Sequence, residues 1–484
     1  MAKRNGGIIG PSNVPTGQYG GTAPGVWRLR DAFNYIKAGL WPGLGNYSVG
    51  NSLRFEASSS DYLSRTQGTP TSNQKFTVST WYKRTKLDVV GDWWSIGSSS
   101  DGLYVNMKFD GSNNLIVVLN DTSSYYLFSS AVFRDVSAWY HIMLAVDTTQ
   151  ATASNRARVY INGIEMTAFS TAGYPTQNYT FPSLASGKSI FVGNRVTDSN
   201  EPLRGYLADY YFIDGQQLTP SSFGQTDSAT GIWTPLPYYG TYGTNGFFLK
   251  FANSASLGTD SSGNGNNLTV NNLTSVDQST DTPTNNFCTW NAVAAPYSAP
   301  TLSEGNTKVT NNTANWQGAI GTFGVSQGKW YWEGRFDSTT FSYNHGVIDE
   351  SVNFSAINPM NATGYTGFYN TDGGEMKKDG TDTTANYGTF GTNDIIGIAL
   401  NMDSKQISIY KNGTILVSNF ALSTTSTLVF PCTVYYSGGY CSYNFGNPPY
   451  AANSYTDAAG YGNFSYAVPS GYYSLCSKNL ATYG

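Results

Sequence analysis

The fold is indicated most strongly by one stretch of the chain, Asn393-Asp-Ile-Ile-Gly-Ile-Ala-Leu-Asn-Met-Asp-Ser-Lys-Gln-Ile-Ser-Ile-Tyr-Lys-Asn-Gly-Thr-Ile415. It contains an apolar run, a polar turn, an alternating run and the dipeptide Asn412-Gly413. Asn-Gly supplies the two positive φ angles of a type I′ turn, which joins the strands of a tight β-hairpin. The same pattern occurs in Arg158-Val-Tyr-Ile-Asn-Gly-Ile164. Two separate hairpins of this kind predict an all-β chain with two antiparallel β-sandwiches.

The composition supports this prediction. Charged residues make up 12% of the 484 residues, where soluble domains average roughly 25%. The chain has 36 tyrosines, and Tyr and Thr favour strands, whereas Glu, Lys and Arg favour helices. The formal net charge is −4 and no basic stripe occurs, which argues against nucleic acid as a partner.

We expect neither secretion by a signal peptide nor membrane insertion. Residues 1–11 contain no apolar region of the length that a signal peptide needs, and no run approaches the roughly 18 apolar residues of a membrane helix. The four cysteines are too few for a disulfide scaffold in so long a chain. Cys432 and Cys441 flank a turn, and either pair across two strands or are separate small core residues.

Residues 1–45 are interpreted as a docking arm that attaches the chain to its surroundings. The first part is rich in Gly and Pro, and apolar residues at helical spacing follow before the stop signals Gly39 and Pro42. So short a helix is marginal in water by itself, so its apolar side must dock on the neighbouring sandwich or on a partner protein. The predicted anchoring residues are Trp27, Leu29, Phe33, Ile36 and Trp41.

Residues 46–222 are predicted to form the first sandwich. Residues 103–109 and 156–161 alternate in the manner of half-buried strands. Residues 115–119 are continuously apolar, which is typical of a strand covered on both faces. The region resembles laminin-G or concanavalin-A-like domains through Phe76-Thr-Val-Ser-Thr-Trp81, Trp139-Tyr-His141, Val159-Tyr-Ile-Asn-Gly163, Gly205-Tyr-Leu-Ala-Asp-Tyr-Tyr-Phe-Ile-Asp214 and Leu218-Thr219.

Residues 223–286 are interpreted as a connector that packs between two domains. Much of it is turn chemistry, as in Asp260-Ser-Ser-Gly-Asn-Gly-Asn266. This loop clusters oxygen-bearing side chains of the kind that calcium binds. It lacks the fixed spacing and the bidentate Glu of an EF-hand, so it is either a plain turn or a calcium loop formed by Asp260, Asn264 and Asn266. No other cofactor is expected.

Residues 287–447 are predicted to form the second sandwich, with Trp330, Trp332 and Phe336 on one face of a strand. The region resembles SPRY domains, which bind partner proteins through their loops. The motifs that carry this resemblance are Gly328-Lys-Trp-Tyr-Trp-Glu-Gly-Arg-Phe336, Gly364-Tyr-Thr-Gly-Phe368, Asp394-Ile-Ile-Gly-Ile-Ala-Leu-Asn-Met-Asp403, Ile409-Tyr-Lys-Asn-Gly413 and Tyr443-Asn-Phe-Gly446. The predicted ligand or interface residues of this domain are Tyr343, His345, Tyr435 and Tyr436.

Residues 448–484 are a C-terminal tail. The whole string of arm, two sandwiches and tail is similar to structural proteins of marine tailed bacteriophages. Two motifs carry most of that resemblance, Val26-Trp-Arg-Leu-Arg-Asp-Ala-Phe33 and Thr282-Pro-Thr-Asn-Asn-Phe287. The resemblance implies a virion protein of the tail-fibre or appendage type, assembled in the host cytoplasm.

The sequence contains no motif of a familiar catalytic site, and we expect no enzyme activity. The two histidines lie in different domains, and His141, between Tyr140 and Ile142, is typical of a packed strand residue. No Cys-x-x-Cys, no Gly-x-Ser-x-Gly and no phosphate-binding loop occurs. Glu-x-Asp-x-Glu, which concanavalin-like glycosidases often carry, is also absent from the sequence.

The expected function is therefore binding. The leading hypothesis is an appendage that contacts a host-surface glycan or protein through sandwich loops, with exposed tyrosines at positions such as 238–239 and 435–436 providing contact area. The alternative is a capsid-decorating or tail-assembly protein whose interfaces are purely structural. Either role implies other virion proteins as partners of the arm, and the resemblance together with the low charge favours a homo-oligomer.

Overall fold

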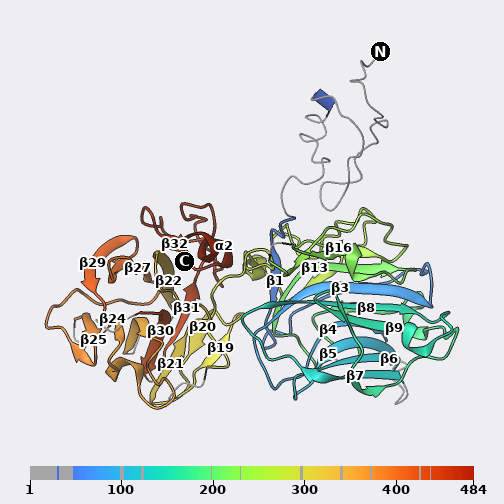
Figure 1. The fold of residues 1–484 in the computed structure, drawn as a ribbon, viewed down its shortest axis with the longest axis horizontal. Coiled ribbons are helices and arrows are strands. Elements are labelled where there is room, and N and C mark those ends of the chain that lie inside the picture. The colour runs from blue at the N-terminus through green and yellow to red at the C-terminus, as the bar shows by residue number, and fades with distance from the viewer. Residues whose placement is uncertain are drawn as a thin grey trace.

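The computed structural model describes residues 30–31, 47–98, 103–120, 125–197, 199–228, 230–294, 298–337, 342–370, 373–423, 427–436 and 438–484. From residue 47 onward the chain forms two β-rich lobes side by side, the first blue to green and the second yellow to red (Figure 1). The predicted anchoring residues Trp27, Leu29, Phe33, Ile36 and Trp41 lie outside the described residues, so the docking arm stays a prediction.

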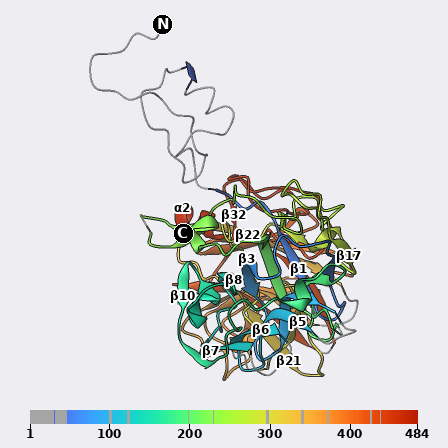
Figure 2. The same ribbon diagram turned by 90° about the vertical axis from the view of Figure 1, so that its right-hand side faces the viewer.

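The first lobe is a sandwich of two sheets (Figure 2). The strands of one sheet are β1 (Ser52–Phe55), β3 (Lys75–Arg84), β8 (Trp139–Asp147), β9 (Ala157–Ile161), β10 (Ile164–Met166), β13 (Gly205–Asp214), β16 (Phe247–Leu249) and β18 (Gln278–Ser279). They are ordered β10-β9-β8-β3-β13-β1-β18, and β16 also pairs with β13.

The opposite sheet has the order β11-β7-β6-β5-β4-β12-β2-β17. Its strands are β2 (Tyr62–Thr66), β4 (Gly91–Gly97), β5 (Tyr104–Phe109), β6 (Asn114–Asn120), β7 (Tyr125–Val132), β11 (Phe169–Ala172), β12 (Ser189–Val192) and β17 (Thr269–Asn271). A small separate ribbon pairs β14 (Gly224–Thr226) with β15 (Trp233–Pro235).

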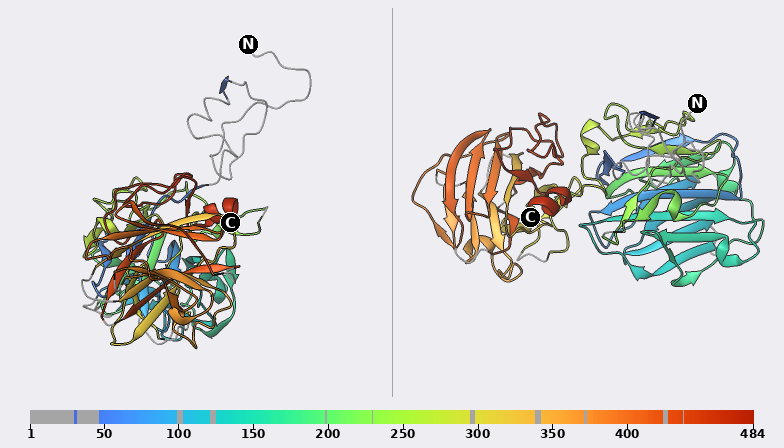
Figure 3. Two further views of the ribbon diagram at one scale, coloured as in Figure 1. Left: turned by 90° about the vertical axis from the view of Figure 1, so that its left-hand side faces the viewer. Right: turned by 45° about the horizontal axis from the view of Figure 1, so that its top comes forward.

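The second lobe, which faces the viewer in the left panel of Figure 3, is also a sandwich of two sheets. One sheet contains β19 (Thr301–Ser303), β20 (Lys308–Thr310), β22 (Lys329–Phe336), β27 (Ile395–Asn401), β28 (Gln406–Lys411), β29 (Thr414–Ala421), β31 (Tyr440–Asn444) and β32 (Tyr473–Ser474). The other contains β21 (Trp316–Ile320), β23 (Tyr343–Asp349), β24 (Tyr365–Tyr369), β25 (Glu375–Lys378), β26 (Thr381–Asp382) and β30 (Val429–Tyr436).

Helical structure in the two lobes is short. One α-helix, α2 (Ser477–Tyr483), ends the chain and lies between the lobes (Figure 3, right). The described single-turn 3-10 helices are η1 (Ala153–Asn155), η2 (Pro182–Leu184), η3 (Pro220–Ser222), η4 (Ser275–Asp277) and η5 (Pro359–Asn361). The ladders within the described residues are antiparallel except that between β22 and β32. The predicted all-β fold with two antiparallel sandwiches is confirmed.

Both Asn-Gly turns adopt the predicted type I′ conformation. Asn162 and Gly163 have φ angles of 49° and 80°, and Asn412 and Gly413 have φ angles of 48° and 78°. The turns close the β9–β10 and β28–β29 hairpins, where Ile161 pairs with Ile164 and Lys411 with Thr414. Positive φ at both central positions matches the twist of the flanking strands, so these dipeptides set the register of both hairpins.

Each sandwich buries its own apolar core between its sheets. Trp330, Trp332 and Phe336 alternate along β22, and all three belong to the core cluster of the second sandwich, as predicted. The apolar run in β6 is covered on both faces, since Leu115 and Val117 belong to the core of the first sandwich and Val118 to an outer cluster. Strand periodicity therefore identified the inner faces correctly.

The segment 223–286 is part of the first sandwich, which corrects its interpretation as a connector. Its short strand β16 pairs with β13, β17 pairs with β2, and β18 pairs with β1. The edges and the outer surface of the first sandwich are thus completed by this segment. The end of the segment, around Asp281 and Asn286, does reach the second lobe.

The C-terminal tail packs against the second sandwich. β32 adds to β22, and Phe464 is buried against Tyr331 and Ala399. The carboxylate of Glu333, which is fully buried, accepts hydrogen bonds from the backbone N–H groups of Ser465 and Tyr466 at 2.9 and 3.0 Å. Residues 448–484 therefore form an integral layer of the second lobe.

Candidate functional site

The predicted ligand residues of the second sandwich are mostly core residues, which corrects that prediction. The exposed fractions of Tyr343, His345 and Tyr435 are 3%, 1% and 0%, because β23 and β30 are central strands of their sheet. His345 hydrogen-bonds to the Tyr443 hydroxyl, and burial lowers the pKa of its imidazole to about 3. Only Tyr436, at 40%, is exposed to a ligand.

His141 is a buried strand residue, as predicted. Its Nε2 lies 2.8 Å from the Ser79 hydroxyl, and its Nδ1 accepts a hydrogen bond from the Trp233 indole at 3.1 Å. Burial lowers the pKa of His141 to about 3. Neither histidine is therefore placed for acid–base chemistry at the surface.

The loop of Asp260, Asn264 and Asn266 has the geometry of a hydrogen-bonded turn. The Asp260 carboxylate accepts bonds from the backbone N–H of Phe248, Ser262 and Asn266. The Asn266 side-chain oxygen accepts a bond from the Arg65 guanidinium at 2.5 Å. Asn264 donates its amide N–H groups to two backbone carbonyls. Among Asp260, Asn264 and Asn266, only the side-chain oxygen of Asn264 lies outside this network. The hypothesis of a calcium loop therefore has no further support.

The four cysteines are buried and unpaired. Cys432 lies on β30 and Cys441 on β31, which belong to different sheets of the second sandwich. The alternative of a Cys432–Cys441 disulfide is thus replaced by two separate core thiols. Among the described residues, no group of three or more His, Cys, Asp or Glu side chains is arranged to hold a metal ion.

A groove lined by tyrosines lies on the outer side of the first sandwich. Its floor belongs to a secondary apolar cluster that covers the outer face of β8 and β13. The groove has a volume of about 670 Å³. We call it the tyrosine groove, and it is lined by residues 237–244, Phe248, Lys250, Ser261, Ser262 and Asn264.

The aromatic side chains of the tyrosine groove are held by one another. The rings of Tyr211 and Phe248 stack at 4.1 Å with an interplanar angle of 8°. Tyr238 packs against Phe223 at 5.3 Å and meets the edge of Tyr242 at 5.3 Å. Tyr239 next to them is 66% exposed. The groove therefore combines a rigid aromatic floor with one ring that faces solvent.

Polar groups fix the walls of the tyrosine groove. The Tyr238 hydroxyl donates to the Thr241 carbonyl at 3.1 Å, and the Tyr242 hydroxyl donates to the Tyr238 carbonyl at 3.3 Å. The Asn264 amide donates to the carbonyls of Gly243 and Gly246 at 2.7 and 2.9 Å, which joins the two walls. Burial raises the pKa of both Tyr238 and Tyr242, so both phenols stay protonated at neutral pH.

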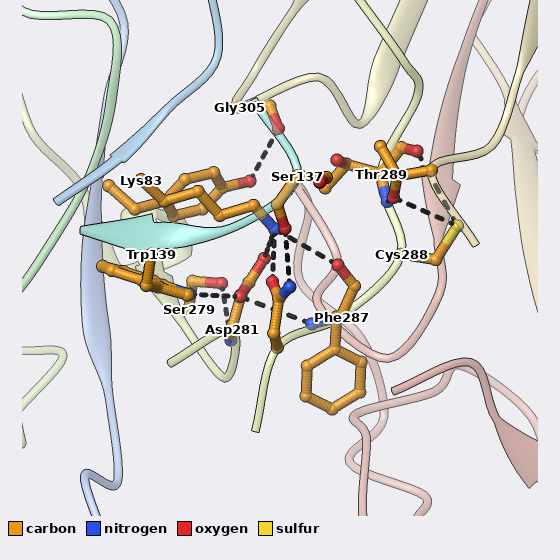
Figure 4. Close-up of polar contacts among 12 residues, drawn as sticks. Lys83, Ser137, Trp139, Ser279, Asp281, Phe287, Cys288, Thr289 and Gly305 are labelled. Carbon is orange, nitrogen blue, oxygen red and sulfur yellow. Dashed lines mark hydrogen bonds and ion pairs between the residues drawn. The ribbon is translucent and has the colours of Figure 1, made fainter. Parts of the chain in front are cut away.

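The two lobes are joined by buried polar contacts, which we call the interdomain joint (Figure 4). Lys83 on β3 and Asp281 are both fully buried and form an ion pair at 2.7 Å. The Trp139 indole donates to the other Asp281 oxygen at 3.0 Å, and the Tyr206 hydroxyl donates to the Gly305 carbonyl at 2.9 Å. Burial raises the pKa of Asp281, and Lys83 opposes this rise.

Arg54 extends the joint. Its side chain is fully buried and donates to the carbonyl of Val276 at 2.8 Å. It forms ion pairs with Asp277 at 3.4 Å and with Glu304 of the second lobe at 3.5 Å. The Asn306 amide reaches back to the Thr85 carbonyl at 2.7 Å. The two sandwiches are therefore held in one relative orientation by directional bonds.

An acidic cleft of about 470 Å³ lies beside the joint. Its carboxylates are occupied: Glu304 faces Arg54 at 3.5 Å and Asp337 faces Arg335 at 2.7 Å. The others accept backbone N–H groups, Asp277 from Thr274, Asp61 from Glu56, and Glu56 from Glu304. Burial raises the pKa of Asp61 and Glu304. The carboxylates of the cleft thus belong to a hydrogen-bond network, part of which links the two lobes, and do not form an open binding site.

Comparison with known protein families identifies both lobes. Residues 57–222 match the family model of the concanavalin A-like lectin/glucanases superfamily, of the laminin-G type, and residues 329–448 match that of the SPRY domain. No curated protein matches the chain. No helix within the described residues is both long and apolar enough to cross a bilayer.

Solved structures with similarity to parts of the chain have low identity. The SPRY domain of human HERC1 is 19% identical, with 28% of this chain and 87% of that one covered and a TM-score of 0.25. The heptameric SAP-like pentraxin of Limulus polyphemus is 18% identical, with 36% and 80% covered and a TM-score of 0.28. The PSpry domain of TRIM65 is 14% identical, with 32% and 88% covered and a TM-score of 0.26.

The molecule is thus a two-module β-sandwich protein. Its first module is a concanavalin A-like, laminin-G-type domain, and its second is a SPRY domain.

Proposed function

We propose that this chain is a bacteriophage virion protein of the tail-fibre or appendage type, which binds a host-surface glycan through the tyrosine groove. The observation that carries the proposal is the combination of the exposed Tyr239 ring with the braced rings of Tyr238 and Tyr242 in one groove. The similarity of the arm and of the 282–287 motif to marine phage structural proteins supports the virion assignment.

The chemistry of the groove suits a sugar. The apolar face of a pyranose packs on an aromatic ring, while its hydroxyl groups need hydrogen-bond partners at the rim. Here Tyr239 offers the ring, and Ser261, Ser262 and Thr244 bring hydroxyl groups to the lining. Such sites are usually pre-formed, concave and apolar with a few placed polar groups. Lys250 at the groove, with its ammonium 5.3 Å from the Phe248 ring centre, favours an acidic polysaccharide.

The test is binding of the purified chain to an array of bacterial surface polysaccharides, followed by titration calorimetry with each positive. Replacing Tyr239 with Ala is expected to weaken binding about tenfold, equivalent to about 1.4 kcal/mol. Tyr455→Ala is the matched control, because Tyr455 is 47% exposed but lies in the tail on the second lobe. Equal affinities of the two variants, or no binding at all, contradict the proposal.

The alternative is a capsid-decorating or tail-assembly protein, and the rigid interdomain joint favours it because a fixed two-lobe body suits a repeating lattice. Location on the particle separates the two functions. Electron microscopy of virions labelled at the C-terminus is expected to place the label at the tail. Label on the shell or the neck supports the alternative. In either role the arm contacts other virion proteins, and a homo-oligomer is expected by light scattering of the purified chain.

A further inference from the structure

We propose that Lys83 and Asn286 form an intramolecular amide bond, with Asp281 as the proton carrier, and that this bond covalently fixes the end of the segment 223–286 to β3 at the interdomain joint. The proposal rests on the geometry of the interdomain joint and is independent of the glycan-binding function. In this proposal Lys83 is more than a member of an ion pair: its nitrogen attacks once the ammonium has lost a proton.

The reacting groups are already in contact. Lys83 Nζ lies 2.7 Å from Asn286 Oδ1 and 2.7 Å from Asp281 Oδ2. The amide carbon of Asn286 is one C=O bond, about 1.2 Å, from Oδ1, so it lies within about 4 Å of Nζ. Near-attack geometry requires reacting atoms roughly 3–3.5 Å apart, so a small rotation of either side chain suffices.

The amide is held in place from three sides. Asn286 Nδ2 donates to the Ser137 carbonyl at 2.6 Å. The backbone N–H of Asn286 donates to the Ser477 hydroxyl at 3.0 Å, and its carbonyl accepts the N–H of Ser477 at 2.8 Å. Ser477, the first residue of α2, therefore fixes the backbone of Asn286. The Ser137 carbonyl, just before β8, binds Nδ2 of Asn286, which is the nitrogen that leaves. Bonds of this kind convert a reaction between two side chains into a positioned, effectively unimolecular step.

The contact between Lys83 and Asp281 is enclosed by protein, which shields a proton passed between them from solvent. The side chains of Lys83 and Asp281 are both fully buried, and Tyr206 and Trp139 adjoin them, with Nζ 5.9 Å from the Tyr206 ring centre. Burial raises the pKa of Asp281, and in a dry site proton transfer from ammonium to carboxylate removes two buried charges.

The step balances without any co-reactant. The Lys83 ammonium passes one proton to Asp281, and the free amine attacks the Asn286 amide carbon, forming the new C–N bond and a tetrahedral intermediate. A proton of the former amine and the proton on Asp281 then reach the departing nitrogen, the original C–Nδ2 bond breaks, and ammonia leaves as ammonium. Asp281 ends as it began, and the chain loses one molecule of ammonia.

Asp281 itself is the less suitable acyl partner. Its Oδ1 accepts bonds from the Trp139 indole and from the Phe287 backbone N–H, so the carboxylate is held as an acceptor. A bond between Lys83 and Asp281 would release water and would need a second acid, yet the described hydrogen-bond partners of Lys83 include no other carboxyl group. Asn286 is therefore the residue that the site presents for amide exchange.

The test is the intact mass of the full-length chain under denaturing conditions, with peptide mapping of the linked fragments. The wild-type chain is expected to weigh less than its sequence by one ammonia, with Lys83 joined to Asn286. Lys83→Arg keeps the positive charge and is expected to restore the sequence mass, as is Asp281→Asn. Lys108→Arg, which alters an ion-paired lysine within the first sandwich, is the matched control and keeps the deficit.

Three outcomes overturn the proposal, and all of them are read on the wild-type chain, so none depends on a variant that folds. A mass equal to that of the sequence means that the contact is an ion pair only. A deficit of one water, with Lys83 joined to Asp281, assigns the bond to the wrong partner. A deficit of one ammonia that maps to another Asn or Gln places the reaction elsewhere.

Discussion

At the scale of single residues, the two turn asparagines do the same task in both modules. The backbone N–H of Asn162 bonds the His141 carbonyl, and its side-chain oxygen accepts the His141 N–H at 2.8 Å. Asn412 makes the same pair of bonds to Ile395, the second at 2.9 Å. Each turn is therefore hydrogen-bonded to a third strand, β8 or β27. This contact gives a second reason for Asn at the first turn position, in addition to its tolerance of positive φ.

Replacement of Asn412 by Ala is expected to destabilise the second module by about 2 kcal/mol, because it adds left-handed backbone strain to the loss of a hydrogen bond. Asn412→Gly relieves the strain and is expected to cost about 1 kcal/mol. Urea unfolding followed by tryptophan fluorescence measures both values. If the two variants are equally stable, backbone strain plays no part at this position.

The buried histidines give stability a pH dependence of known sign. Burial lowers the pKa of His141 to about 3 in the fold, against an ordinary value of 6.5. Between these values only the unfolded chain takes up the proton, so the contribution of His141 is complete above pH 6.5 and is lost as the pH falls towards 3. The measurement is the difference in the free energy of unfolding between the wild-type chain and His141→Gln, in which the contributions of other titrating groups cancel. This difference is expected to shrink by about 1.4 kcal/mol per pH unit below pH 6. Parallel pH curves would show that His141 is already charged in the fold.

Local patterns predicted residues well where the cause is local. The Asn-Gly turns, the buried His141 and the inward Trp330 and Trp332 all follow from spacing along one strand. Burial of Tyr343, His345 and Tyr435 depends instead on the pairing of β23 with β24 and β30, which brings together residues far apart in the chain. Whether a strand is central or at an edge cannot be read from its own sequence.

At the scale of elements, the strands of the segment 223–286 are too short to be predicted from its sequence. β16 and β17 have three residues each, too few to show an alternating pattern, and they exist because an existing sheet offers them partners. The tyrosine groove was anticipated only in part: Tyr238 and Tyr239 were expected to be exposed, but its second wall, at 261–264, comes from that same segment.

The tail depends on one carboxylate. Asp457 is buried and accepts bonds from Ser474, through both N–H and hydroxyl, and from the Asn479 amide. Asp457→Ala is expected to release β32 and α2, with a loss of about 2–4 kcal/mol because several donors are left unpaired. Hydrogen exchange by mass spectrometry measures this in residues 473–483. Asp382→Ala, at a more exposed carboxylate of β26, is the control, and unchanged exchange in both variants contradicts the role of Asp457.

At the scale of the whole molecule, the interdomain joint predicts that the two modules unfold together. Arg54 is fully buried and contacts groups from both sides of the joint, and removal of one partner from buried ion pairs typically costs about 3–5 kcal/mol. Differential scanning calorimetry is expected to give one transition for the wild-type chain and two for Arg54→Ala. Arg158→Ala, which alters a half-exposed pair with Glu165, is expected to keep one. Two transitions in the wild-type chain would mean that the modules melt independently.

The four buried thiols have a consequence for how the chain responds to oxidants and reductants. Burial raises the pKa of Cys288 to about 11 and raises that of the other three as well, so none is an attacking thiolate at neutral pH. Folding to this structure then requires no oxidant and no disulfide isomerase, because the four thiols are unpaired in it. The amide bond proposed between Lys83 and Asn286 is a covalent link of another kind, which reducing agents leave intact.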